Sequence, residues 1–291
     1  SWRRYSYGNF TGIRIMGVFQ NNLLAGAAAA ASSGASGFYD YQIEQSLRLD
    51  RNHNDRLYRT PSSAGNRRTF TISFWLKRAE TNQFQTAIIQ SDDPNTVNKT
   101  SSINFLTEAN GTGFEGIISF GLNGGSAAVA YSAGRYKDTS GWMHLVHRVD
   151  TTQSTNTNRT RSYINGTQIS YGDEVGTTTY PSQNYETGFC NTSQIVVGSN
   201  VNANSNYPLA GYLAEVILAD GTSYAPTQFG ETKNGVWIPK DPSGTSFGTT
   251  GFHLKFENAS DLGNDSSGNN NDFSTSAGAD HQVLDSPTFG S

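Results

Sequence analysis

Hydrophobic and polar residues alternate through the middle of the chain, and the pattern predicts short strands joined by tight connections. Residues 142–150 are rich in β-branched and aromatic side chains and are followed by a run of Thr, Gln, Ser and Asn, which predicts a strand and then a loop. Residues 159–164 resume a strand, and Asn165 and Gly166 supply the two positive-φ positions of a type I′ turn before residues 167–169. This segment therefore predicts an antiparallel hairpin.

Similar patterns along the rest of the chain predict an all-β fold. Residues 69–77 alternate aromatic and aliphatic side chains with Thr and Ser, so we expect a central strand there. The other strands are separated by turns rich in Gly and Asn, and their spacing of roughly 8–12 residues is typical of a sandwich or a barrel. We expect these strands over residues 86–90, 103–106, 116–122, 127–131, 194–198, 212–218 and 252–256.

The strand predicted near residue 215 contains a glutamate among apolar neighbours. Regular alternation along a strand places Leu213, Glu215 and Ile217 on one face, opposite Tyr212, Ala214, Val216 and Leu218. Further along the chain, residues 226–229 predict a short helical turn that begins with proline. Residues 266–272, SSGNNND, predict a loop that does not pack in a core.

The N-terminal residues lack this pattern of alternating strands and turns. They predict an arm over residues 1–42, followed by a sandwich over residues 43–291. Residues 23–31 favour a short helix, which Asn21 or Asn22 would cap, and the Gly and Ser residues after it suit a flexible tether. The arm is either a disordered leader or a segment that docks on another subunit. The apolar residues expected to make that docking contact are Ile13, Ile15, Val18, Phe19, Leu23 and Leu24.

Composition narrows the classes of function. The chain has 291 residues, which allows one large β domain or two smaller ones. Charged residues make up only 15% and the net charge is −4, so the surface is largely neutral and we expect no nucleic-acid partner. The single cysteine, Cys190, excludes an intramolecular disulfide framework. No apolar run is long enough for a membrane-spanning helix, so we expect no membrane insertion.

Several segments together resemble the laminin-G-like, concanavalin A-type sandwich. They are SLRLD (46–50), RTPSSAGNRRTFTISFWLKR (59–78), WMHLVHRVDTT (142–152), SYINGTQI (162–169), LAGYLAEVILADG (209–221) and FENASDLGNDSSGNNNDF (256–273). The segment FQNNLLAGAAAAA before SLRLD and the segment DSPTFG near the end resemble segments of virion structural proteins of marine tailed bacteriophages that carry this sandwich. The resemblance implies two antiparallel sheets in jelly-roll topology and exposure on the surface of the virion.

Two features depart from the family pattern. The strand after Trp142 is usually a run of small aliphatic residues, whereas here His147 and Arg148 interrupt it, so we expect that sheet face to be partly solvated or functional. The segment DSSGNNND often opens such a domain, and here it lies near the end. That position predicts either a permuted boundary strand or the start of a following module.

The sequence offers little for catalysis. Retaining glucanases on this sandwich use an E-x-D-x-x-E strand, which places two carboxyl groups about 5 Å apart, and the chain has no such triplet. The pairs Asp40 with Glu44 and Asp261 with Asp265 lie in turn-like sequence, where solvated carboxylates are the rule. The histidines are dispersed, and a spacing of three puts His144 and His147 on opposite faces of a strand. We therefore expect a protein that is not an enzyme.

Two kinds of binding remain open. Calcium accepts carboxylate and amide oxygens from loops, and the densest cluster of such groups contains Asp261, Asn264, Asp265 and Asp272. We expect no other cofactor. Glycans need aromatic rings and neutral hydrogen-bonding groups. The candidate tyrosines lie in predicted loops or at strand ends, where they serve either glycan contact or packing at the rim, and they are Tyr131, Tyr136, Tyr171, Tyr180, Tyr185 and Tyr207.

The first functional hypothesis is a non-enzymatic structural protein of a tailed-phage virion, in a capsid-decoration or tail-fibre position. Its sandwich would be displayed outward, and edge strands and the arm would build a homo-oligomer and hold it to other virion proteins. The alternative is an adhesin that recognises host-surface glycans. A glycoside hydrolase is the third hypothesis.

Overall fold

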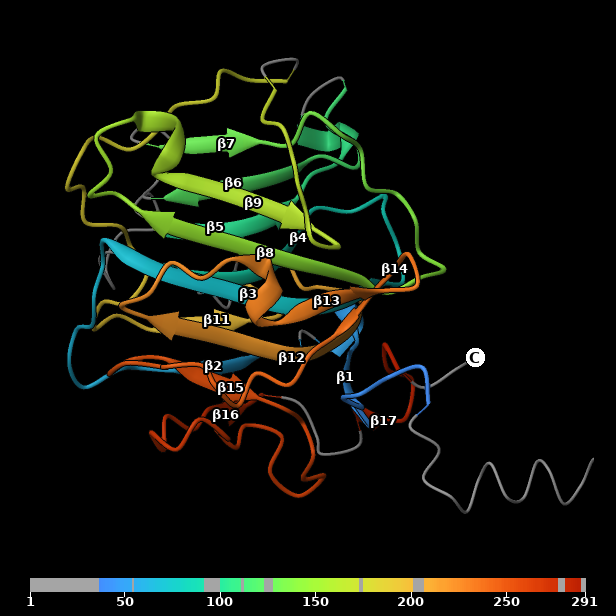
Figure 1. The fold of residues 1–291 in the computed structure, drawn as a ribbon. Helices are drawn as coiled ribbons and strands as arrows, with labels where there is room; N and C mark the ends of the chain where they lie inside the picture. Colours follow the sequence, from blue (N-terminus) through green and yellow to red (C-terminus); the bar gives the residue numbers. More distant parts are fainter. Residues whose placement is uncertain are drawn as a thin grey trace, which may run out of the picture. The chain divides into compact units, whose positions relative to one another are not determined.

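The computed structural model describes residues 37–53, 55–91, 100–110, 113–122, 128–172, 175–200, 207–276 and 281–288. The chain divides into residues 1–40 and 41–291, and the second unit contains two antiparallel sheets packed against each other (Figure 1). Its helical segments within the described ranges are single 3₁₀ turns: η1 (Arg51–His53), η2 (Glu108–Asn110), η3 (Asn156–Asn158) and η4 (Pro226–Gln228). The predicted all-β sandwich is confirmed. None of the helices in these ranges has the length and apolar character needed to cross a membrane.

The first sheet has eight strands in the order β10-β9-β8-β3-β12-β1-β17, with β15 paired beside β12. β3 occupies the centre, as its unbroken run of buried residues requires. The bounds are β1 (Ser46–Leu49), β3 (Thr69–Arg78), β8 (Met143–Asp150), β9 (Thr160–Ile164), β10 (Thr167–Gln168), β12 (Gly211–Asp220), β15 (Phe252–Leu254) and β17 (Gln282–Val283).

The second sheet has seven strands in the order β16-β2-β11-β4-β5-β6-β7. In Figure 1 it lies behind the first sheet, and a separate hairpin, β13–β14, crosses in front of β3 and β12. The bounds are β2 (Leu57–Arg59), β4 (Gln85–Ser91), β5 (Thr100–Phe105), β6 (Ile118–Leu122), β7 (Val129–Tyr131), β11 (Ile195–Val197), β13 (Gly230–Lys233), β14 (Val236–Pro239) and β16 (Ser274–Thr275).

The core fills the space between the two sheets with side chains from alternate strand positions. Phe70 and Phe74 of β3 and Leu145 of β8 face Ile103 of β5 and Phe120 of β6 in one buried cluster. Each fully buried side chain of this size contributes roughly 1.5–3 kcal/mol relative to exposure to water. The chain therefore folds by apolar burial, and no disulfide is needed.

The turn residues explain two hairpins. Asn165 (φ 47°) and Gly166 (φ 76°) form the predicted type I′ turn between β9 and β10. Asn234 (φ 53°) and Gly235 (φ 82°) form the same turn between β13 and β14, a hairpin that the sequence analysis did not predict. The two hairpins meet, because a Cβ atom on Gly166 would lie 2.3 Å from the ring of Trp237 in β14.

A β-bulge in β12 overturns the predicted alternation of that strand. Pairing with β3 shifts register between Ala214 and Ile217, and Glu215 has a φ of 51°. The extra residue rotates the strand by one position, so Leu213 and Val216 both point into the core while Ala214 and Ile217 point outward. The predicted faces were therefore wrong from Glu215 onward, since Glu215 lies on the outer face and Leu213 on the core face.

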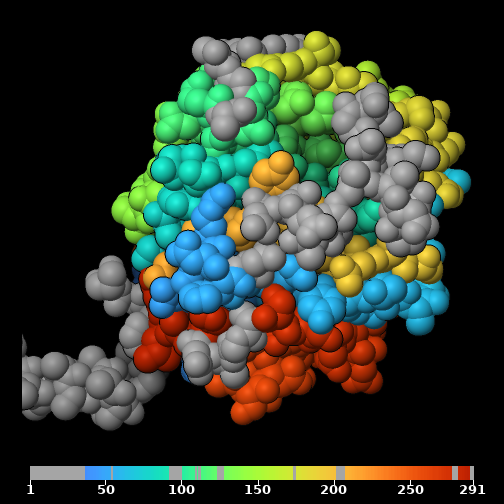
Figure 2. All heavy atoms as spheres, turned by 180° about the vertical axis from the view of Figure 1, so that it is seen from behind, coloured from blue at the N-terminus to red at the C-terminus, as the bar shows by residue number. Residues whose placement is uncertain are grey.

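The C-terminal segment closes the sandwich beside its first strand. β17 pairs with β1, and Figures 1 and 2 both show the last described residues (red) beside the segment that contains β1 (blue). The backbone N–H of Ile43 donates to Thr288 Oγ1 at 2.8 Å, and Ser286 Oγ donates to the Ile43 carbonyl oxygen. These bonds fix the start of the sandwich to residues near its end.

Candidate functional site

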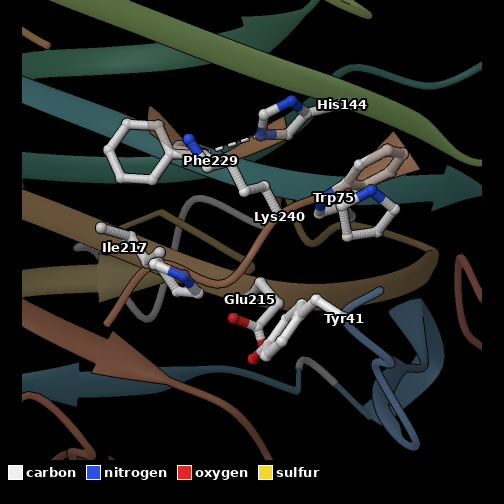
Figure 3. A pocket seen from close by; sticks show the side chains of 10 residues that line it. Tyr41, Trp75, His144, Glu215, Ile217, Phe229 and Lys240 are labelled. Atoms are coloured by element: carbon white, nitrogen blue, oxygen red, sulfur yellow. Dashed lines mark hydrogen bonds between the residues drawn. The ribbon is translucent and has the colours of Figure 1, made fainter. Parts of the chain in front are cut away.

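The outer face of the eight-stranded sheet, turned away from the core, is covered by the β13–β14 hairpin. Figure 3 shows the pocket between them, which we call the hairpin pocket, with Glu215 pointing toward Tyr41 below His144 and Trp75. The pocket volume is about 10 Å³, enough for about one water molecule. Its lining residues are Tyr41, Ser73, Trp75, His144, Glu215, Ile217, Phe229, Pro239, Lys240 and Pro242.

Glu215 is a buried carboxylate whose two oxygens are both engaged. Tyr41 donates its hydroxyl to Oε1 at 3.2 Å, and Nε2 of His253 lies 2.5 Å from Oε2. The bulge turns this side chain toward His253 on the neighbouring strand β15, and Phe247 stacks on the imidazole. Burial and the adjacent Glu215 raise the pKa of Tyr41, so its phenol stays protonated as a donor.

Ser73 and His144 form a second polar pair in the hairpin pocket. Ser73 Oγ lies 2.8 Å from His144 Nε2, and the indole N–H of Trp237 donates to His144 Nδ1 at 2.9 Å. Because indole is only a donor, Nδ1 must carry the lone pair, and the neutral ring must carry its proton on Nε2. His144 therefore donates to Ser73 and is in the wrong tautomer to accept its proton as a general base.

His144 and His147 lie on opposite faces of β8, as their spacing predicts. His144 stacks on Trp75 on the outer face, whereas His147 stacks on Phe120 between the sheets. Burial lowers the pKa of each imidazole to about 3. His147 is 1% exposed, so it does not make this sheet face partly solvated, and the alternative expectation, that the face is functional, stays a prediction. Its Nδ1 bonds Ser162 Oγ at 2.8 Å.

A serine motif that is typical of hydrolases occurs at residues 244–248, GTSFG. The structure places it in a loop between β14 and β15, and not in the strand-to-helix elbow that such a nucleophile requires. Ser246 is exposed, and its backbone N–H donates to the hydroxyl of Tyr224. The motif therefore has no catalytic geometry here.

The outer face of the seven-stranded sheet has different chemistry. Tyr131 of β7, Ser119 of β6, Asn104 of β5 and Thr86 of β4 are direct cross-strand partners, and we call them the polar row. Asn104 and Tyr131 are half-buried, while Thr86 and Ser119 are buried. The inward neighbours of these residues, such as Ile103 and Phe120, belong to the core, so the row faces away from it.

Hydrogen bonds hold the amide of Asn104 at the centre of the polar row. Its Oδ1 accepts from Thr86 Oγ1 at 3.0 Å, and its Nδ2 donates to Ser102 Oγ at 2.8 Å and to Ser119 Oγ at 3.4 Å. Both serine oxygens thus act as acceptors, which leaves their O–H groups to donate elsewhere. The row contains hydroxyl, amide and aromatic groups without a charged side chain.

The six candidate tyrosines occupy different environments. Tyr131 belongs to the polar row and contacts the edge of Phe114. Tyr207 is 41% exposed beside Phe84, and its carbonyl oxygen accepts from the backbone N–H of Thr86, so it lies next to the other end of the row. Tyr171 packs on the core, where burial raises its pKa, and donates to or accepts from Ser162 Oγ.

The remaining three candidates lie apart from the polar row. Tyr180 contacts Tyr171 with ring centroids 6.3 Å apart. Tyr136 packs against the core, and its carbonyl oxygen accepts from Arg78 Nη1. The Tyr185 carbonyl oxygen accepts from Thr151 Oγ1 in a loop at the opposite end of the sheets from Ala79 and Ala210. The structure thus places only Tyr131 and Tyr207 at the row.

The candidate calcium ligands surround the loop at residues 265–272. Asp265 accepts from the backbone N–H groups of His253, Ser267 and Asn271, and Asp272 Oδ1 accepts from the backbone N–H of Asp265. Asp261 is exposed. Within the described ranges, no group of three His, Cys, Asp or Glu side chains is close enough to hold a metal ion. Calcium binding by Asp261, Asn264, Asp265 and Asp272 stays a prediction.

The apolar residues predicted to dock the arm, from Ile13 to Leu24, lie outside the described residues. Sequence reasoning also missed partners of the hairpin pocket. Tyr41 and His253 are separated from Glu215 by 174 and 38 positions, and no local pattern joins them. For Trp237 a signal was present, because Asn234-Gly235 marks the hairpin that brings it to His144.

Two rim clefts are larger than the hairpin pocket. One, of about 690 Å³, lies beside the start of β3 and contains Arg67 and Arg68, which share Glu186 as their ion-pair partner. The other, of about 340 Å³, lies at the end of β3, beside Ala79 and Tyr212. Both volumes fall in the range of ligand-binding pockets, roughly 300–1,000 Å³.

Comparison with solved structures finds the same fold. A candidate carbohydrate-binding protein from Bacteroides ovatus superposes with a TM-score of 0.54 at 13% identity, over 81% of this chain and 58% of that protein. This chain therefore spans less than two thirds of its length. A heptameric SAP-like pentraxin from Limulus polyphemus gives a TM-score of 0.42 at 14% identity, covering 64% of this chain and 81% of the pentraxin.

The IT-sialidase CBM40 of Ruminococcus gnavus, bound to α2,3-sialyllactose, gives a TM-score of 0.37 at 12% identity and covers 59% of this chain and 89% of that one. No curated protein matches the sequence. A family model does match, however, over residues 52–223, which is more than half of the chain. The chain therefore belongs to the concanavalin A-like lectin/glucanases superfamily.

Proposed function

We propose that this sandwich binds a neutral glycan on the polar row and does not hydrolyse it. The observation that carries the proposal is the row itself: Tyr131, Ser119, Asn104 and Thr86 cross four neighbouring strands on the face turned away from the core. A sugar presents hydroxyl groups and an apolar ring face, which match an amide, hydroxyls and an aromatic ring. A lectin-like fold supports the same conclusion.

The bonds of the acidic and nucleophilic groups support binding without hydrolysis. Glycoside hydrolysis needs two carboxyl groups beside the scissile bond, and the polar row has none. The carboxylate in the hairpin pocket, Glu215, uses both oxygens for Tyr41 and His253. The Ser73–His144 pair has the tautomer that cannot activate a hydroxyl. These arrangements support a binding protein over a hydrolase.

A glycan array followed by calorimetry with the best neutral oligosaccharide tests the proposal. Asn104→Ala removes an amide that is fixed by hydrogen bonds, and Tyr131→Ala removes the ring at the end of the row. Each loses roughly 1–2 kcal/mol of interaction, so we expect the affinity to fall about tenfold. Asn156→Ala, an exposed asparagine on a loop beside β9, is the control and should bind like the original chain.

Two results would reject the glycan site. One is the absence of any neutral glycan bound at millimolar concentration by the original chain. The other is an affinity that Asn104→Ala and Tyr131→Ala leave unchanged, which would place the ligand elsewhere.

The setting that the sequence favours is the surface of a tailed-phage particle. The segment FQNNLLAGAAAAA before SLRLD supports this second part of the proposal, because it is similar to virion structural proteins with this sandwich. Residues 1–42 would then anchor a homo-oligomer to other virion proteins, and the polar row would meet host glycans. Mass spectrometry of purified particles should find the chain, and its absence there would contradict this setting.

The arm is tested separately by deleting residues 1–42. We expect the remaining chain to fold, because the described strands begin at Ser46, and the deletion removes from the sandwich the bond that Tyr41 donates to Glu215. We also expect it to lose assembly in sedimentation experiments. A deletion variant that assembles like the full chain would remove the anchoring role.

A further inference from the structure

The rim cleft of about 340 Å³ opens where β1 and β3 end and β12 begins, and small residues form its floor. Gly211 has a φ of 148°, and a Cβ atom there would lie 2.3 Å from the carbonyl oxygen of Lys77, so only glycine allows this approach of the strands. Ala210 and Ala79 lie beside it, joined by a backbone hydrogen bond of 2.9 Å. Larger side chains surround this floor, and the small size of the floor residues leaves an open cavity between them. We call it the Arg48 cleft, and its lining residues are Arg48, Leu49, Asp50, Arg51, Asn52, Ala79, Glu80, Ala210, Gly211 and Tyr212.

An aromatic ring forms one wall of the Arg48 cleft. Tyr212 is the direct cross-strand partner of Arg48 on β1 and of Lys77 on β3. The Lys77 ammonium lies 5.7 Å from the centre of the tyrosine ring, and Trp142 contacts the ring at 6.3 Å. Asp285 accepts from Lys77 Nζ at 2.8 Å and from the Trp142 indole at 3.0 Å. These contacts fix the position of the Tyr212 ring.

The charges of the cleft are paired except for one. Arg51 bonds Glu80 at 3.0 Å, and Lys77 pairs with Asp285. Asp50 accepts from the backbone N–H of Asn52 through Oδ1 and pairs with His53 through Oδ2. Arg48 is exposed, and within the described part of the chain its guanidinium has no ion-pair or hydrogen-bond partner. The backbone N–H of Asn52 and, from further away, the charge of Arg48 lower the pKa of the Asp50 carboxyl at the edge of the cleft. The fork of N–H donors on Arg48 is therefore available to a ligand.

We propose that the Arg48 cleft binds an acidic saccharide, with a sugar carboxylate on Arg48 and a sugar ring against Tyr212. A guanidinium pairs with a carboxylate through two parallel hydrogen bonds, and a tyrosine ring packs on the apolar face of a sugar. The Arg48 cleft and the polar row lie on different sheets, so this site does not depend on the neutral-glycan proposal. The chain would then distinguish charged from neutral sugars by using two separate surfaces.

Calorimetry of the full chain with a galacturonic acid trisaccharide and the matching neutral galactose trisaccharide tests the inference. We expect the acidic sugar to bind at least about tenfold more tightly at low salt, and Arg48→Ala to abolish that difference. Arg48→Lys keeps the charge without the fork, so an intermediate affinity is expected. Equal affinity for the two sugars, or an unchanged affinity in Arg48→Ala, would overturn the inference.

A second variant blocks the cleft without changing its charges. Ala79 is exposed on the floor, so Ala79→Phe should fill the cleft with little effect on folding, which thermal denaturation checks. It should lower the affinity for the acidic trisaccharide about tenfold and leave neutral-glycan binding as it was. Asn104→Ala should lower the affinity for the neutral glycan and leave the affinity for the acidic trisaccharide unchanged. If Asn104→Ala weakens both sugars and Ala79→Phe weakens neither, one site on the polar row binds both, and the Arg48 cleft is rejected.

Discussion

The outer face of the eight-stranded sheet lies under the β13–β14 hairpin, whereas the outer face of the seven-stranded sheet carries the polar row. On the first face, Trp75 is 4% exposed and stacks on His144, with ring centroids 4.6 Å apart. On the second, Asn104 and Tyr131 are half-buried between hydroxyl groups. Both faces contain hydrogen-bonded polar side chains, yet only the first combines them with large buried rings.

We infer from this difference that the first face is a structural polar network and that the second is the proposed binding surface. In the hairpin pocket, Glu215 and His144 have partners on every atom that can bond, and the free volume admits about one water molecule. At the polar row, the hydroxyls of Ser119 and of the adjacent Ser102 accept from Asn104 and keep their own protons for another acceptor. A network with remaining donors can bind a ligand, and a fully satisfied one stabilises the fold.

The largest expected effect comes from Trp75→Ala on the covered face. Removal of this buried indole leaves a cavity beside His144, so the free energy of unfolding should fall by about 3–5 kcal/mol in urea denaturation. Trp142→Ala is the matched control, because Trp142 lies on the same sheet face and is half-exposed. A loss in Trp75→Ala no greater than in the control would show that the covered face does not carry the stability assigned to it.

The second largest effect is expected from acid, which should lower the free energy of unfolding through His144 under the β13–β14 hairpin. The pKa of His144 is about 3 in the folded chain, whereas an unfolded histidine takes up its proton near pH 6.5. The unfolded state therefore binds more protons as pH falls below about 6.5, and stability is lost progressively down to about pH 3. The slope for one histidine is about 1.4 kcal/mol per pH unit in this window.

His144→Gln isolates this contribution from the carboxylates. The variant should lose stability less steeply than the original chain between pH 6.5 and 4.5, because one proton-uptake site of the unfolded state is gone. His147→Gln should flatten the slope by a similar amount, since burial lowers its pKa equally. Parallel curves for the original chain and both variants, measured by urea denaturation at several pH values, would contradict the burial of neutral imidazoles.

The sheets could be predicted from the sequence because neighbouring residues in the chain determine where strands and tight turns form. Alternation in residues 69–77 and the Asn165-Gly166 turn set β3 and the β9–β10 hairpin with their neighbours in the chain. The bulge at Glu215 could not be read in this way, since a regular period has no room for an extra residue. Its carboxylate is stabilised by Tyr41 and His253, whose positions only the tertiary fold defines.

The candidate site, too, could be predicted only as far as local sequence patterns reach. Tyr131 and Tyr207 are two of six tyrosines that were predicted as glycan contacts from their aromatic character and their place in predicted loops or strand ends. The structure places these two at the polar row. Asn104 and Ser119 were not predicted, because they meet only through cross-strand register. The same register joins Arg48 to Tyr212 across strands that are far apart in the sequence. Neutral residues at strand centres gave no sign of function until their neighbours across the sheet were known.

The smallest expected effect on stability comes from Asn104→Ala on the polar row. Asn104 is half-buried and its partners are hydroxyls that water can satisfy, so the free energy of unfolding should fall by no more than about 1 kcal/mol. Glycan affinity should nevertheless fall about tenfold, which separates binding from folding. Thermal denaturation and calorimetry on the same sample check both values. A loss of stability as large as that in Trp75→Ala would show that the polar row is a structural network like the hairpin pocket. The two faces would then differ only in how deeply their side chains are buried.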